Sequence, residues 1–190
     1  LPYGDIDALT QTMDDDVAAV FVEPIQGEGG VHPAPPGFLP ALRELTHRHD
    51  ALLVIDEIQT GMGRTGAWLA HQRDEIGGGI TPDVVTMSKA LGGGVPIGAT
   101  IAYGPAVAGL LTPGSHGSTF AGNPLAATAA LTTISVIERD HLMSRAETLG
   151  NKLRAACAQA NPDLVTEVRG VGLLLALQLT APVAAKFVQH

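Results

Sequence analysis

The stretch ALLVIDEIQTG, residues 51–61, decides how this chain folds. Its first five residues form an uninterrupted apolar run, and the carboxylate of Asp56 follows immediately. Such a run, without alternating polar residues, is typical of a strand covered on both faces in a mostly parallel sheet. We therefore predict a buried strand over residues 51–55 with an acidic side chain at its carboxyl end.

Two further apolar runs lie on either side of this strand in the sequence. Residues 17–22 precede Glu23, and residues 83–87 precede Ser88 and Lys89. We predict that both runs form strands of the same sheet and that residues 17–22 are also covered on both faces. We therefore predict three strands, each of which is followed closely by a charged residue.

The connections set the strand directions. Residues 38–49 carry leucines at a spacing of three, which predicts an amphipathic helix between the first two strands. A strand–helix–strand order favours parallel strands with right-handed crossovers. The link from the third strand to an apolar run at residues 97–103 is too short for a crossover, so we predict a fourth, antiparallel strand.

After Gly122 the sequence changes to helical patterns. Asn123 followed by Pro124 suits the cap and first position of a helix. The elements expected in this part are helices at about 124–139 and 142–160, strands at 165–168 and 173–179, and a final helix from residue 181. We therefore predict an α/β fold: residues 1–140 form part of a large domain, a mostly parallel sheet with helices on both faces, and residues 141–190 begin a smaller α+β domain.

The composition excludes several classes of function. The 190 residues carry a formal net charge of −8 without a basic run, so nucleic acid and anionic membranes are poor partners. The single cysteine, Cys157, excludes an internal disulfide and suggests a reducing, cytoplasmic location. No apolar run is long enough to span a bilayer, and no signal peptide is visible. Because the chain begins with Leu1 and its last helix lacks a stop signal, we expect it to be part of a longer protein.

Charged side chains at the strand ends indicate where chemistry takes place. Glu23, Asp56 and Lys89 each follow an apolar run, where a charge is costly unless it is paired or used. Ligands of open parallel sheets bind beyond the carboxyl ends of the strands. A lysine amine can bind an aldehyde covalently, and a carboxylate beside a pyridine nitrogen keeps that nitrogen protonated. Taken singly, however, such a lysine is more often a surface residue, and such an aspartate a turn former.

Two other patterns point away from nucleotides and metals. Residues 61–66, GMGRTG, spell GxGxxG, but no acidic residue follows at the distance that a dinucleotide site needs. We expect this loop to shape the floor of a pocket. His47, His49 and His71 lack ligand partners at useful spacing, so we predict solvated histidines and no metal site.

Four strings occur in a fixed order: EPIQGEGG at 23–30, DEIQTG at 56–61, SKALGGG at 88–94 and HGSTFAGNP at 116–124. Together they resemble the class III (ornithine/acetylornithine type) aminotransferases of pyridoxal 5'-phosphate (PLP) fold type I, over about residues 3–185. The resemblance implies the large-domain core of that fold, PLP as cofactor, and a homodimer with a shared active site.

The resemblance also implies roles for individual residues. Lys89 is expected to be catalytic and to hold PLP covalently. Asp56 is expected to pair with the pyridine nitrogen, and Gln59 to lie near the phenolic oxygen of the ring. We also expect the Lys89 amine to be buried.

Three further residues are implied to contact phosphate or substrate. Thr119 is expected to bind the phosphate of the partner subunit's cofactor, and Ser118 to lie beside the substrate. Glu28 is expected to pair with an arginine near the C-terminus of the family's chains and to help select the amino donor.

The reaction implied by the resemblance moves the δ-amino group of N-acetylornithine to 2-oxoglutarate, a step of arginine biosynthesis. Ornithine, 4-aminobutyrate and diaminobutyrate are alternative donors, because the residues that separate them lie mostly outside this stretch of the family. Family chains are about twice as long. They carry a glycine-rich phosphate loop, a ring-stacking aromatic and a carboxylate-binding arginine that this sequence lacks. A catalytically silent fragment or structural remnant is the alternative of another class.

Overall fold

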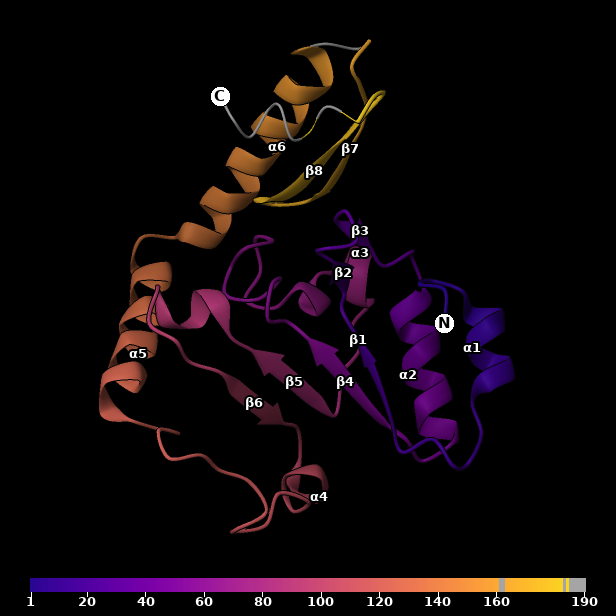
Figure 1. The fold of residues 1–190 in the computed structure, drawn as a ribbon, viewed down its shortest axis with the longest axis vertical. Coiled ribbons are helices and arrows are strands. Elements are labelled where there is room, and N and C mark those ends of the chain that lie inside the picture. Colours follow the sequence, from indigo (N-terminus) through magenta and orange to yellow (C-terminus); the bar gives the residue numbers. More distant parts are fainter. Residues whose placement is uncertain (161–162, 183, 185–190) are drawn as a thin grey trace.

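A computed structural model of the chain describes residues 1–160, 163–182 and 184, and its centre is a four-stranded sheet (Figure 1). The strands stand in the order β1 (Ala19–Val22), β4 (Leu52–Asp56), β5 (Val84–Met87) and β6 (Ala99–Ala102). The first three are parallel, and β6 is antiparallel to β5. The predicted strand directions, including the reversal of the fourth strand, are confirmed.

Helices and short hairpins precede, connect and follow these strands. The helices are α1 (Ile6–Thr12), α2 (Phe38–Arg48), α3 (Asp74–Gly77), α4 (Pro105–Ala108), α5 (Pro124–Arg139) and α6 (Leu142–Ala160), with 3-10 turns η1 (Ala70–Gln72) and η2 (Lys89–Gly92). The hairpins pair β2 (Ile25–Gln26) with β3 (His32–Pro33), and β7 (Val165–Val171) with β8 (Leu174–Leu179).

Local sequence signals set the helix boundaries. The side chain of Asn123 accepts a hydrogen bond from the backbone N–H of Ala126 at 2.9 Å, and Pro124 occupies the first helical position of α5. In α1, the side chain of Asp5 caps the backbone N–H of Ala8 in the same way at 2.8 Å. The predicted start of α5 is therefore confirmed.

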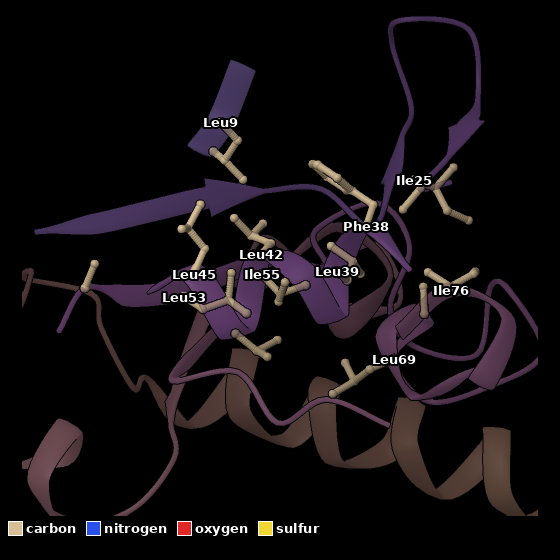
Figure 2. Close-up of a cluster of buried hydrophobic side chains, with 14 of the residues drawn as sticks. Leu9, Ile25, Phe38, Leu39, Leu42, Leu45, Leu53, Ile55, Leu69 and Ile76 are labelled. Carbon is tan, nitrogen blue, oxygen red and sulfur yellow. The ribbon is translucent and has the colours of Figure 1, made fainter. Parts of the chain in front are cut away.

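The main core lies between α2 and one face of the sheet (Figure 2). Leu39 and Leu42 of α2 are buried together with Leu53 and Ile55 of β4. Full burial of a leucine or isoleucine side chain contributes roughly 1.5–3 kcal/mol, so this layer fixes the position of β4 and of Asp56 at its end.

The other face of the sheet is less covered at its β1 edge. Phe21 points away from the core because alternate residues of a strand face opposite sides, and its side chain is 73% exposed. Its register partner on β4, Val54, is buried. The prediction that residues 17–22 are covered on both faces is therefore wrong at Phe21, since β1 is an edge strand of the sheet.

Helix α6 and the β7–β8 hairpin lie together at one end of the molecule (Figure 1). The Arg154 guanidinium donates to the carbonyl of Gly170, which joins the helix to the hairpin. A Cβ atom at Gly150 would overlap the backbone of Gly172, so the glycine lets the two elements approach closely. Most of the helix predicted from residue 181 lies outside the described residues.

None of the helices in the described ranges combines the length and the apolar character needed to cross a membrane.

Candidate active site

The ends of β4 and β5 bring two of the predicted site residues to one edge of the sheet. Asp56 is the last residue of β4, and Lys89 follows β5 by two residues. The strands are parallel, with Asp56 in register with Thr86. Glu23 directly follows β1, the parallel neighbour of β4. The three charged residues therefore lie along the carboxyl edge, where ligands of such sheets bind.

The Asp56 carboxylate is held on one side only. Its Oδ1 accepts a hydrogen bond from the backbone N–H of Ile58 at 2.9 Å, and no other bond to the carboxylate is formed among the described residues. The half-buried side chain lines an open pocket of about 440 Å³, whose wall also includes Tyr3, Glu23 and Gln26. This arrangement fixes the orientation of the carboxylate and leaves Oδ2 available to a cationic partner.

The backbone at Lys89 adopts an unusual conformation. Its φ is +44°, a left-handed value that is uncommon for residues other than glycine. The hydroxyl of the preceding Ser88 donates to the carbonyl of Ile97 at 2.7 Å, which ties the start of η2 to the next segment. Backbone strain of this kind persists where the surroundings enforce it, and it is concentrated at functional sites.

The Lys89 amine forms no hydrogen bond or ion pair within the described part of the chain, and its side chain is exposed. The prediction of a buried amine is therefore wrong. In this chain Lys89 begins the turn η2, two residues beyond the last residue of β5, and is therefore not part of the covered strand.

Gln59 and Glu28 come together at the same edge. The Gln59 side-chain amide donates to Glu28 Oε1 at 3.4 Å, and the N–H of Gly27 donates to Glu23 Oε2 at 3.1 Å. A Cβ atom at Gly27 would overlap the end of the Gln59 side chain. The EPIQGEGG and DEIQTG motifs thus form one contiguous surface.

Ser118 and Thr119 lie elsewhere. Both are exposed in the loop between α4 and α5, which in Figure 1 lies below β6, away from the arrowheads of β4 and β5. Ser118 lines a separate hollow of about 310 Å³ together with Ile97 and Asn123. Within this chain, the structure does not bring Ser118 or Thr119 to Asp56 and Lys89.

Tyr3 borders the pocket near Asp56. Its hydroxyl donates to the carbonyl of Glu23 at 2.7 Å, and its ring packs edge-on against Phe38 with centroids 5.5 Å apart. Burial, with a smaller contribution from the negative charge of Glu23, raises the pKa of the Tyr3 phenol. Tyr3 therefore connects the N-terminal segment to the segment that follows β1.

A buried carboxylate that was not predicted from the sequence lies next to Asp56. Glu57 is 1% exposed, and its oxygens accept bonds from the hydroxyl of Thr60, the backbone N–H groups of Ala70 and His71, and the His71 ring. The three nitrogen–oxygen distances are each 2.9 Å. Burial raises the pKa of Tyr103, and the negative charge of Glu57 makes a smaller contribution in the same direction.

This network corrects the prediction for His71. The side chain is buried, 3% exposed, and bound to Glu57, because η1 turns its N–H groups and the imidazole toward the carboxylate. The only sequence signal was a second acidic residue directly after Asp56, which an apolar strand end tolerates only when it is paired. The network ties the turn that carries Gln59 to Ala70 and His71.

The GMGRTG loop also differs from its prediction. Gly63 lies against Met143 and Ile137, and the Arg64 carbonyl accepts a hydrogen bond from Leu173 N at 3.0 Å. The loop therefore packs between α5, α6 and the β7–β8 hairpin and does not form the floor of the Asp56 pocket. In the described residues, no group of three or more His, Cys, Asp or Glu side chains could hold a metal ion.

Residues 3–190 match the aminotransferase class-III family. The chain belongs to this family. The predicted family membership is confirmed, as is the α/β class with the large-domain core of PLP fold type I. The four motifs that identified the family include the two sheet-end residues, Asp56 and Lys89.

Curated relatives support the same assignment for this class III aminotransferase chain. It is 59% identical over 180 residues to acetylornithine aminotransferase of Mycobacterium bovis, covering 95% of this chain and 44% of the relative. It is 48% identical over 189 residues to acetylornithine aminotransferase of Streptomyces coelicolor, covering 100% of this chain and 46% of the relative. The chain thus spans less than half the length of these relatives.

Solved structures of the family have the same fold. N-acetylornithine aminotransferase from Stenotrophomonas maltophilia matches with a TM-score of 0.83 and 44% identity, over 98% of this chain and 48% of that one. Ornithine aminotransferase from Toxoplasma gondii matches with a TM-score of 0.87 and 41% identity, over 94% and 42%.

Proposed function

We propose that the protein is a PLP-dependent aminotransferase that moves the δ-amino group of N-acetylornithine to 2-oxoglutarate, a step of arginine biosynthesis. The observation that carries the proposal is the placement of Asp56 and Lys89 at the ends of neighbouring parallel strands. Relatives named acetylornithine aminotransferase, at 48–59% identity, support the choice of donor.

The residues at the sheet edge fit the cofactor. Asp56 has a carboxylate oxygen without a hydrogen bond among the described residues, suited to the protonated ring nitrogen. Lys89 has an amine without a partner there, suited to the aldehyde end, and Gln59 is proposed to lie near the phenolic oxygen. When bound, PLP supplies an aldehyde that forms covalent bonds with amines and a ring that accepts electrons.

In this proposal each side chain has a distinct task. Lys89 would hold the cofactor covalently in the resting enzyme, and its Nζ would accept the proton that leaves the δ-carbon of the donor. The same amine would then donate that proton to the cofactor carbon next to the transferred nitrogen. Asp56 remains a carboxylate and keeps the ring nitrogen protonated. Glu28 helps select the donor.

The proposal includes a homodimer with a shared site. Thr119 would bind the phosphate of the partner subunit's cofactor, and Ser118 would lie beside substrate. Their exposed loop, away from Asp56, supports a role in a site other than that of the same chain. We also propose a domain boundary at residue 140, between the end of α5 and the start of α6, and a cytoplasmic location.

Ornithine is the second candidate donor. The likeness to the ornithine aminotransferase of Toxoplasma gondii, at a TM-score of 0.87, favours it. The two donors differ in whether the α-amino group is acetylated and therefore neutral. A donor pocket that discriminates between the two molecules must therefore recognise the charge at the α-nitrogen.

The test compares donors on the full-length holoenzyme. We expect kcat/KM for N-acetylornithine, with 2-oxoglutarate as acceptor, to exceed that for ornithine and 4-aminobutyrate. Lys89→Ala should lower kcat by at least about 1,000-fold because it removes nucleophile and base together. Lys152→Ala, an exposed position on α6, is the matched control and should keep full activity. Equal activity of the two lysine variants, or a preference for 4-aminobutyrate, would contradict the proposal.

A further inference from the structure

Arg169 of β7 binds the loop that carries Glu28. Its Nε and Nη2 both donate to the carbonyl oxygen of Gly30, each at 3.0 Å. Its Nη1 pairs with Glu167 at 2.7 Å, and the side chain is 14% exposed. The forked guanidinium of Arg169 therefore joins two residues that are 139 positions apart in the sequence. Its remaining N–H groups are bonded to Glu167 and Gln178.

The loop held by this fork is a tight turn. The N–H groups of Gly30 and Val31 both donate to the carbonyl of Gly27 at 3.1 Å. Val31 is buried and has a φ of +55°, a strained value for a β-branched residue. A Cβ atom at Gly170 would lie 2.8 Å from Val31 Cγ1, so β7 also packs directly on the strained residue. Such strain persists only where surrounding contacts enforce it.

Glu28 itself is held weakly. Its side chain is exposed, and its hydrogen bond from Gln59 is long, at 3.4 Å. Within the described residues, the position of its carboxylate is therefore set mainly by the backbone of the turn. Arg169 supplies two hydrogen bonds to that turn from the distant strand β7.

We propose that Arg169 is a positioning residue for Glu28 and that it couples the β7–β8 hairpin to the selection of the amino donor. This inference rests on the proposed function, in which Glu28 helps select the amino donor. A lysine cannot replace Arg169, because an ammonium lacks the planar fork that places two donors on one oxygen. Glu167 is not needed, since its bond uses the nitrogen that does not contact Gly30.

The experiment is a double-mutant cycle on the full-length holoenzyme with Arg169→Lys, Glu28→Gln and the combined variant. The first measurement is the ratio of kcat/KM for N-acetylornithine to that for ornithine. We expect Arg169→Lys to change this ratio by about tenfold, as loss of a charge-assisted contact does, mainly through the donor KM. In the Glu28→Gln background the same substitution should change it by less than about twofold.

The second measurement is amide hydrogen exchange, which does not depend on activity. Arg169→Lys should accelerate exchange at Gly30 and Val31 by about tenfold, because the turn loses its external anchor. The control Glu167→Gln should leave both the exchange rates and the donor ratio unchanged.

The outcomes separate the two claims. An additive cycle, or an unchanged donor ratio in Arg169→Lys, overturns the positioning role even if the enzyme is active. If the parent enzyme transfers no amino group from either donor, the proposed function fails. In that case unchanged exchange at Gly30 and Val31 overturns the anchoring by Arg169, and faster exchange supports it.

Discussion

Removal of the Glu57 carboxylate should weaken the protein more than any change at an exposed acid. In Glu57→Ala, the buried backbone N–H groups of Ala70 and His71 lose their acceptor, as do the Thr60 hydroxyl and the His71 ring. Each buried donor without an acceptor costs about 1–3 kcal/mol. The two backbone groups alone give a loss of about 2–6 kcal/mol, and the unpaired side chains add a smaller amount.

Glu57→Gln keeps the shape of the side chain and one oxygen. Its amide nitrogen replaces the other oxygen and then faces a donor. If it stands in place of Oε2, the Thr60 hydroxyl can rotate to accept from it, and only the N–H of Ala70 is left without an acceptor. The expected cost is about 1–3 kcal/mol. The order of stability is therefore parent, then Gln, then Ala.

The assay is urea denaturation followed by circular dichroism, with Glu44→Gln as the matched control. Glu44 is 75% exposed and, among the described residues, pairs with Arg48 alone, so its change should stay within about 0.5 kcal/mol. If Glu57→Ala lies within about 1 kcal/mol of this control, the carboxylate does not hold the turn, and our reasoning on the network is refuted.

Three further changes have distinct signatures. Gly27→Ala should displace Gln59, because the new Cβ would overlap the end of that side chain. A PLP titration should then show binding that is several-fold weaker than in the parent. Binding equal to the parent would mean that the displacement of Gln59 has no consequence for the cofactor. Gly170→Ala should cost at least about 2 kcal/mol by urea denaturation, because φ is +107° and the Cβ would overlap the carbonyl of Leu174; a neutral effect would contradict the hairpin geometry. The pKa of Tyr3 is raised by burial, so the unfolded chain releases its phenolic proton first, at a pH of about 10. Stability should be intact below that pH and fall above it, and Tyr3→Phe should make this fall shallower; identical slopes would contradict the assignment.

Much of the sheet follows from local pattern. The apolar runs before Asp56 and Lys89, and the leucine spacing of residues 38–49, need only burial and periodicity to be interpreted. The antiparallel β6 follows from the length of a loop. These features are local, so one sequence suffices to predict them.

What could not be predicted depends on contacts across the fold. Burial of His71 requires Glu57 to be in reach, and the anchoring of Gly30 requires Arg169 from a distant hairpin. The exposure of Phe21 depends on which strand lies at the sheet edge. The family resemblance supplied the candidate roles of Ser118 and Thr119, whose position away from Asp56 no pattern in the residues could indicate.

The most direct test of the central claim is to titrate the full-length protein with PLP, reduce it with borohydride and map the labelled peptide by mass spectrometry. The sequence offers three lysines in this stretch, at positions 89, 152 and 186. We expect a visible absorbance band and the cofactor-derived mass on Lys89 alone, with both lost in Lys89→Ala. Label on another lysine, or on none, would contradict the assignment of the site.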